Sequence, residues 1–279
     1  MTFDQITVVI TSYKSDKKIV NCLKSINNQC KTVIVENSDN IATKEKIEKN
    51  FANTECLIAG KNLGYAKGNN FGLSKVKTKY ALILNPDAEL KTDTLQNFFK
   101  TVRKVENFAI IGPAIQDETN TKINQNELTE VNSVKGFAMF LNLEQFNNIG
   151  FFDDNFFIYL EEIDLCKRLK ENNKKIFIDP SILINHQGGS SHEEEYNFEM
   201  ELSRNWHWMW STFYFTKKHK GFLYALFYTF DKLISGLIKY FFYSLTLKRS
   251  KKLIYKHRVS GLFNSMIGKP SWFRPFSNN

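Results

Sequence analysis

Short apolar runs, separated by segments with helical periodicity, fill the first part of the chain. The runs are rich in β-branched and aliphatic residues, which predicts buried strands at residues 6–10, 32–35, 56–58, 80–84 and 109–112. The segment after the first run carries Ile19, Leu23 and Ile26 at helical spacing. This alternation predicts right-handed βαβ units in an α/β fold, with the run at 80–84 in the middle of the sheet.

Apolar runs and helical spacing also predict strands and helices further along the chain. Residues 134–141, 176–178 and 182–184 predict strands, whereas 92–106 and the second half of 151–169 predict helices. We interpret the glycine- and asparagine-rich stretch 62–72 as a loop that leads into a helix. Residues 116–132 are polar and predict an irregular loop.

One long amphipathic helix is predicted at residues 222–245. Its apolar residues keep i, i+3, i+4 spacing, and Asp231 and Lys232 lie near its middle. Because each charge would cost about 3 kcal/mol at the centre of a bilayer, the pattern favours a helix that lies in the membrane interface. A helix that packs on its own domain is the alternative. We therefore expect one domain at 1–215 and a basic, aromatic-rich helical extension at 216–279, closed by a short helix from Ser260.

Composition indicates a globular protein with a basic C-terminal region. Hydrophobic residues make up 42% and charged residues 24% of the chain, which excludes disorder and an ordinary polytopic membrane protein. The formal net charge is +9, with the excess past residue 215. Basic residues beside aromatic ones suit an anionic membrane surface. Nucleic acid is the competing partner, but no recognition motif accompanies the charge, so we expect none to bind.

The four cysteines are scattered without a Cys-x-x-Cys pair, which indicates reduced thiols rather than a disulfide or zinc framework. The residues after Met1 show no order typical of a secretion signal. We therefore expect a cytoplasmic protein, held peripherally on the inner face of the cell membrane.

Polar side chains follow two of the predicted strands directly. The strand at 80–84 ends on Asn85-Pro86-Asp87, and the strand at 32–35 ends on Glu36. In open α/β sheets ligands gather at the carboxyl ends of strands, where an acid can hold a divalent metal and the metal a phosphate. An ordinary turn with solvated acids is the alternative for Asp87 and for Glu89.

Taken in order, the motifs resemble those of family 2 inverting glycosyltransferases, and within them the rhamnosyltransferase-type branch that builds bacterial surface polysaccharides. The resemblance covers about residues 5–215 as an ordered set. The motifs that carry it are Ile10-Thr11-Ser12-Tyr13, Val35-Glu36-Asn37-Ser38-Asp39, Asn62-x-Gly64-Tyr65-Ala66-x-Gly68-Asn69-Asn70-x-Gly72, Leu84-Asn85-Pro86-Asp87, Phe152-Asp153, Tyr159-Leu160-Glu161-Glu162-Ile163-Asp164-Leu165-x-x-Arg168 and His186-x-x-Gly189-Ser190-Ser191.

This resemblance implies a GT-A fold, a Rossmann-like mixed central sheet flanked by helices. It also implies a nucleotide-sugar donor, a divalent Mg²⁺ or Mn²⁺ cofactor and inversion at the anomeric carbon. Asp87 and His186 correspond to the groups that hold the metal or diphosphate, although a lone histidine in such a loop is otherwise more often a hydrogen-bonded surface residue. The family's donor-binding positions fall on Thr11, Tyr13, Glu36, Asn62, Gly64, Asn69 and Asn85. A plain tight turn would explain the glycines equally well.

Inversion in one displacement needs a single base opposite the leaving group. The Glu-Asp pair that supplies it in the family reads Glu161-Glu162 here, so the resemblance leaves open which glutamate is the base. Asp164 and Arg168 lie four residues apart on the same predicted helix, where an internal ion pair accounts for both.

We therefore expect a glycosyltransferase that moves a deoxyhexose such as rhamnose, or a hexose, from a dTDP- or UDP-sugar to a lipid-linked or growing glycan acceptor. A catalytically silent nucleotide-sugar-binding subunit of a membrane assembly is the alternative. A nicotinamide-dependent dehydrogenase is less favoured still, because no Gly-x-Gly-x-x-Gly follows the first strand.

Overall fold

The computed structural model describes residues 2–114, 127–186 and 191–276. The chain forms two compact units, one made of Met1–Phe152 and Glu162–Glu193, the other of Asp153–Glu161 and Glu194–Asn279. This division differs from the expected boundary at 215, because residue 215 lies inside the continuous helix α6 (Asn197–Lys220). We call the two parts the sheet unit and the helical unit.

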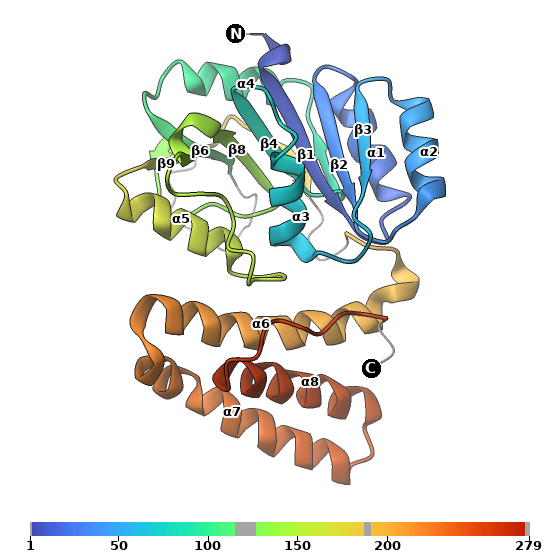
Figure 1. Ribbon diagram of the computed structural model, residues 1–279, viewed down its shortest axis with the longest axis vertical. Helices are drawn as coiled ribbons and strands as arrows, with labels where there is room; N and C mark the ends of the chain where they lie inside the picture. The colour runs from blue at the N-terminus through green and yellow to red at the C-terminus, as the bar shows by residue number, and fades with distance from the viewer. Residues whose placement is uncertain (1, 115–126, 187–190, 277–279) are drawn as a thin grey trace. The chain divides into compact units, whose positions relative to one another are not determined.

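The sheet unit is built on an eight-stranded mixed sheet in the order β3-β2-β1-β4-β8-β6-β9-β7 (Figure 1). The neighbours β3-β2, β2-β1, β1-β4 and β6-β9 are parallel, whereas β8 is antiparallel to both β4 and β6. The strand at 80–84 lies in the middle of the sheet, as expected. The strands are β1 (Ile6–Ser12), β2 (Lys31–Glu36), β3 (Thr54–Ile58), β4 (Tyr80–Leu84), β6 (Phe108–Pro113), β7 (Thr129–Glu130), β8 (Ala138–Asn142) and β9 (Lys175–Asp179).

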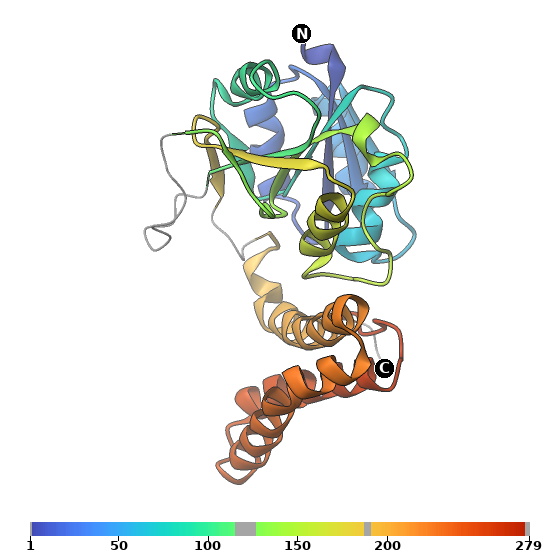
Figure 2. The ribbon, with the colours of Figure 1, turned by 90° about the vertical axis from the view of Figure 1, so that its left-hand side faces the viewer.

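Helices cover both faces of this sheet. The main apolar core takes Val8 and Ile10 of β1 together with residues of α1, α2 and α4. The glycines of α3 instead face Val9, whose side chain points to the other side of the strand. Figure 2 shows the sheet edge-on between these layers. The helices are α1 (Lys18–Ile26), α2 (Ile41–Asn50), α3 (Gly64–Leu73), α4 (Thr94–Val102) and α5 (Glu161–Glu171).

The stretch 62–72, interpreted from its glycines as a loop, is mostly the helix α3, so that interpretation was wrong. A Cβ at Gly72 would lie 2.5 Å from Val9 Cγ1 and 3.3 Å from Val35 Cγ2, and one at Gly68 would lie 2.5 Å from Thr11 Cγ2. The glycines therefore serve close packing of a helix on β1 rather than a turn. This close packing offsets their low helix propensity.

Replacing Gly72 with alanine should destabilise the protein by about 1–3 kcal/mol, because the new methyl group would overlap Val9. Helix propensity alone predicts a gain of up to about 1 kcal/mol, so the sign of the change separates the two effects. Denaturant unfolding of Gly72→Ala, Val9→Ala and the double variant would measure this. The double variant should be more stable than the sum of the two single changes predicts. A stabilised Gly72→Ala protein would contradict the close packing.

A second, two-stranded sheet was not predicted. β5 (Ala88–Leu90) pairs antiparallel with β10 (Ile184–His186). The strand expected at 134–141 begins only at Ala138, and residues before it form the turn that leads to the sheet.

The helical unit consists of α6, α7 (Phe222–Leu245) and α8 (Arg249–Met266) (Figure 1). The bounds of α7 are those predicted, whereas α6 was not predicted and α8 is longer than expected. A Cβ at Gly261 of α8 would lie 2.1 Å from the carbonyl oxygen of Trp206, so only glycine permits this approach of α8 to α6. Within the described ranges, no helix is both long and apolar enough to cross a membrane.

The segment 153–161 groups with the helical unit because α6 holds it along its length. Tyr214 donates a hydrogen bond of 2.9 Å to Asp153, and the Lys218 ammonium lies 2.7 Å from the same carboxylate. Burial raises the pKa of Asp153, but the hydrogen bonds from Lys218 and Asn155 and the charge of Lys218 together outweigh burial and lower the pKa to about 2. Ser211 donates to the carbonyl oxygen of Ile158 at 3.0 Å. Asp153 therefore anchors the start of the segment 153–161 on α6.

Candidate active site

The two predicted metal ligands come together through the unpredicted sheet. Asn85-Pro86-Asp87-Ala88 forms a turn, in which the Ala88 amide donates to the Asn85 carbonyl at 3.1 Å. β5 follows the turn directly, and its pairing with β10 sets His186 opposite Ala88. As a result Asp87 Oδ1 lies 3.5 Å from His186 Nε2, although the two residues are far apart in the sequence.

This pair fits a divalent cation. The Asp87 and His186 side chains are only 4% and 20% exposed, and the buried His186 Nε2 has no hydrogen-bond partner among the described residues. Carboxylate and imidazole are ligands that Mn²⁺ accepts. The part of the chain that the structure describes has no group of three or more metal-binding side chains. Two protein ligands leave coordination positions for phosphate oxygens and water, which is the usual pattern for Mg²⁺ at phosphate-binding sites.

The residues 135–137, just before β8, connect the parts of the site. The ring of Phe137 stacks on the His186 imidazole, with ring centres 4.3 Å apart and planes at 6°. Its carbonyl oxygen accepts a hydrogen bond of 2.8 Å from the Asn85 amide. Phe137 therefore contacts both the histidine ring and the backbone of the turn that carries Asp87. No local pattern indicates this role, because Phe137 falls within the strand predicted at 134–141 as one more apolar position.

Replacing Phe137 with leucine should weaken Mn²⁺ binding by about 10–100-fold, the usual effect of losing a group that orients a metal ligand. The expected cause is loss of the flat surface that fixes the imidazole. Mn²⁺ titration followed by electron paramagnetic resonance would measure it, with the conservative Phe137→Tyr variant expected to retain affinity. Equal affinity in the leucine variant and the native protein would show that His186 needs no stacking partner.

Glu36, Tyr13 and Asn62 gather at the carboxyl ends of β1 and β2. The Glu36 side chain is fully buried, and its Oε1 accepts a hydrogen bond of 2.6 Å from the Ser38 amide. Its Oε2 and the Thr11 hydroxyl are buried without a hydrogen-bond partner among the described residues. Burial raises the pKa of Glu36. Burial also raises the pKa of Tyr13; a hydrogen bond with Asn62 opposes this second shift, and the nearby negative charge of Glu36 adds to it. This cluster leaves unused acceptors for a ligand's N–H group.

The start of α3 borders the same cluster. The Gly64 amide donates to Asn62 Oδ1 at 3.0 Å, and Gly64 has φ +76°, which favours glycine. Asn37 donates to the Gly64 carbonyl at 3.2 Å and so ties α3 to the end of β2. Asn69, expected to bind the donor, is fully buried within α3 and donates to the Tyr65 carbonyl at 3.0 Å.

The two candidate bases stand at the start of α5 in different surroundings. Glu161 is 5% exposed. It is the last residue of the segment 153–161, which groups with the helical unit, whereas Glu162 is the first residue of the segment 162–193, which groups with the sheet unit. A Cβ at Gly136 would lie 3.6 Å from Glu162 Cβ, and the Tyr65 hydroxyl donates to the Gly136 carbonyl. Burial raises the pKa of Glu162, and the nearby Lys135 opposes the shift. Glu162 therefore faces the segment that carries Phe137.

The backbone before α5 is strained. Tyr159 and Leu160 have φ of 73° and 67°, so two consecutive residues other than glycine adopt the left-handed conformation. Each costs about 1–3 kcal/mol, and such strain concentrates at functional segments. The ring of Tyr159 packs edge-on against Trp208, with centres 5.4 Å apart. Contacts within the helical unit thus stabilise the turn that leads into Glu161 and Glu162.

Asp164 and Arg168 form the ion pair that was expected, with Nε 2.8 Å from Oδ2. Arg168 also donates to the carbonyl oxygens of Ile149 and Phe151. Both residues therefore stabilise the approach to α5. Gly189 and Ser190 of the histidine motif lie outside the described residues.

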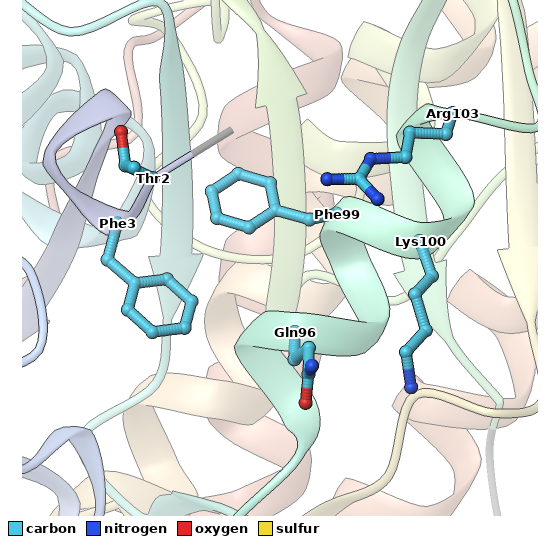
Figure 3. A pocket seen from close by; sticks show the side chains of 6 residues that line it. All are labelled: Thr2, Phe3, Gln96, Phe99, Lys100 and Arg103. Carbon is cyan, nitrogen blue, oxygen red and sulfur yellow. The ribbon is translucent and has the colours of Figure 1, made fainter.

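A cavity of about 520 Å³ lies at the amino end of β1, opposite the strand ends described above (Figure 3). Phe3, just before β1, stacks on Phe99 of α4 at 5.6 Å, and Lys100 and Arg103 reach its rim. Since ligands of α/β sheets bind at the carboxyl ends of strands, this cavity is separate from the candidate active site.

Comparison with solved structures defines the class of protein. The mannosyltransferase PcManGT from Pyrobaculum calidifontis, in complex with GDP-Man and Mn²⁺, superimposes with a TM-score of 0.62, 12% identity and coverage of 94% of this chain and 87% of that one. S. aureus TarS 1-349 in complex with UDP-GlcNAc gives a TM-score of 0.54, 12% identity and coverage of 98% and 93%. The fold is that of the GT-A glycosyltransferases, as expected.

The model of glycosyl transferase family 2 matches residues 7–167, so the chain belongs to this family and is a glycosyltransferase. The rhamnosyltransferase WbbL of Escherichia coli is 25% identical over 239 residues, 72% of this chain and 88% of that protein. A low-salt glycan biosynthesis hexosyltransferase of Haloferax volcanii is 26% identical over 199 residues. That match spans 62% of this chain and 64% of the archaeal protein.

Proposed function

We propose that this glycosyltransferase moves a hexose or deoxyhexose such as rhamnose from a nucleoside diphosphate donor to an acceptor hydroxyl, with inversion. The observation that carries the proposal is the pairing of Asp87 Oδ1 and His186 Nε2, 3.5 Å apart at the end of β4. Phe137 stacks on this histidine, and its neighbour Gly136 faces Glu162. One short segment thus connects a site for the diphosphate with a carboxylate suited to act as a base.

Asp87 and His186 would hold a divalent Mg²⁺ or Mn²⁺ ion, which supplies Lewis-acid stabilisation of the leaving diphosphate. Glu162 accepts the proton of the acceptor hydroxyl as that oxygen bonds to the anomeric carbon. The bond from this carbon to the phosphate oxygen breaks, and its electron pair leaves with the nucleoside diphosphate. Burial raises the pKa of Glu162, which makes it a stronger base than an ordinary glutamate.

Glu36 supports a UDP- or dTDP-sugar as the donor. Its buried Oε2 lacks a partner among the described residues, and an acceptor there suits the imide N–H of uracil or thymine. Guanine also presents N–H donors that a carboxylate can accept, and the neighbour PcManGT holds GDP-Man, so a GDP-sugar is the donor to test beside these two. Tyr13 and Asn62 lie beside this position and would contact the base and ribose.

For the acceptor we propose a lipid-linked or growing glycan at the inner face of the cell membrane, in bacterial surface polysaccharide synthesis. The similarity to a rhamnosyltransferase and to a hexosyltransferase of glycan biosynthesis supports this class. The basic helical unit supports a location near anionic lipid.

A donor panel would test the proposal. Purified protein with Mn²⁺ and UDP-glucose, UDP-GlcNAc, dTDP-rhamnose or GDP-mannose should release UDP or dTDP, measured by nucleotide detection. Release from GDP-mannose alone would contradict the proposed UDP- or dTDP-sugar donor. Tight donor binding without turnover, with or without a lipid-linked glycan, would support a catalytically silent binding subunit instead.

A further inference from the structure

The outward face of α7 is an exposed apolar stripe. Its members recur every three or four residues, and each is between 41% and 83% exposed. At 100° per residue they fall within an arc of about 80°. We define the stripe as Leu223, Phe227, Phe230, Ile234, Ile238, Phe241 and Leu245.

The opposite face of α7 supplies the contacts within the helical unit. Ala225 is fully buried in a cluster with Phe213 and Leu262, and Thr229 and Gly236 are also buried. A Cβ at Gly236 would lie 3.0 Å from Val259 of α8. Packing inside the helical unit therefore uses this second face and leaves the stripe exposed. The alternative considered from the sequence was a helix that packs on its own domain. Such packing explains why Ala225, Thr229 and Gly236 are buried, but it does not explain the exposed stripe.

The C-terminal region that includes α7 is strongly basic and rich in aromatic residues. From residue 216 onward the chain has thirteen lysines and arginines and a single acidic residue, Asp231. Several lysines lie over tyrosine rings: the distance from Nζ to ring centre is 4.9 Å for Lys232 and Tyr228 and 5.3 Å for Lys239 and Tyr255. Tyrosine and lysine both have apolar bodies and polar tips, and both favour the level of lipid headgroups.

We propose that α7 is a membrane-docking helix, which lies in the plane of an anionic bilayer with the stripe in the headgroup and acyl boundary. Apolar area supplies one part of the affinity and attraction of the lysines to anionic lipid the other. A second copy of this chain is the less suitable occupant, because pairing two such stripes would bring two strongly basic C-terminal regions together. The inference concerns lipid and does not depend on which sugar is transferred.

Vesicle co-sedimentation of the full chain would test this proposal. We expect binding to vesicles of phosphatidylcholine with 30% phosphatidylglycerol, weak binding to phosphatidylcholine alone, and a decrease of at least about tenfold between low salt and 0.5 M salt, where the Debye length shortens. The double variant Phe227→Glu and Phe241→Glu should lose at least about tenfold in partition coefficient. Both side chains are more than 60% exposed, so the variant should keep the native thermal midpoint.

Ser235→Glu is the control, matched to the single stripe variant Phe227→Glu, because each adds one negative charge to an exposed position of α7 and only Phe227 belongs to the stripe. It should lose much less binding than Phe227→Glu. Three outcomes would overturn the proposal: no binding to anionic vesicles, equal loss in Ser235→Glu and Phe227→Glu, or a dimer in sedimentation velocity that the stripe variant abolishes. Donor hydrolysis by the stripe variant, measured without vesicles, should stay at the native rate whether or not the membrane proposal holds.

Discussion

Replacing Glu162 with glutamine is expected to lower kcat for sugar transfer by about 10²–10⁴-fold, the usual contribution of a general base. Glutamine keeps the volume of the side chain but cannot accept the proton of the acceptor hydroxyl. Donor affinity, measured by calorimetry, should change little, because Glu162 faces Gly136 and Lys135 rather than the Glu36 cluster. Steady-state kinetics with a fixed donor would give the ratio.

The pH profile adds a second readout for Glu162. Burial raises the pKa of this carboxyl despite the nearby Lys135, so kcat should fall as the pH is lowered through that raised pKa, where the base becomes protonated. This acidic limb should disappear in Glu162→Gln. Glu161→Gln is the matched control, since it makes the same change one residue earlier. If Glu161→Gln loses activity and Glu162→Gln does not, the base is Glu161.

Replacing Asp87 with asparagine should lower metal-dependent kcat/KM by about 10²–10³-fold. A bound cation contributes several kcal/mol of transition-state stabilisation, and each 1.4 kcal/mol corresponds to a tenfold change in rate. Asparagine preserves the turn that ends at Ala88 but removes the charge that would attract the metal. Turnover at increasing Mn²⁺ concentrations would show whether the loss is partly recovered at high metal.

Glu89→Gln is the control for Asp87, because Glu89 follows two residues later in β5 and pairs with Asn185 across the small sheet. It should retain most of the native activity. Removal of metal from the native protein with a chelator should abolish transfer, and added Mn²⁺ should restore it. Undiminished activity of Asp87→Asn, or activity that survives chelation, would exclude the proposed metal site.

Part of the site could be predicted from the sequence because strand ends are marked locally. An uninterrupted apolar run that stops at Asn85-Pro86-Asp87 marks the end of β4, and the run that stops at Glu36 marks the end of β2. The ordered motifs then indicated the family, and the family match confirmed it. The four-residue spacing of Asp164 and Arg168 on a predicted helix also predicted their ion pair, because residues i and i+4 lie on one face of a helix.

The remaining errors came from residues whose role depends on distant neighbours. The glycines of α3 read as loop residues, but Val9 and Val35 across the sheet are what require them. The division into two units differs from the boundary expected at 215, because the segment 153–161 groups by contacts with α6, which follows it by tens of residues. Phe137 read as a strand residue, and only the structure sets its ring on His186.

The sequence by itself determined most strands of the large sheet, the helix α7, the family and the polar groups at the strand ends, because these depend on local periodicity and on the order of motifs. The tertiary structure decided which of those groups meet. Asp87 and His186 become a pair through the β5–β10 sheet, and Glu162 joins them through Gly136 and Phe137. Such contacts depend on strand pairing and close packing between segments far apart in the chain, which local patterns of hydrophobic and polar residues do not encode.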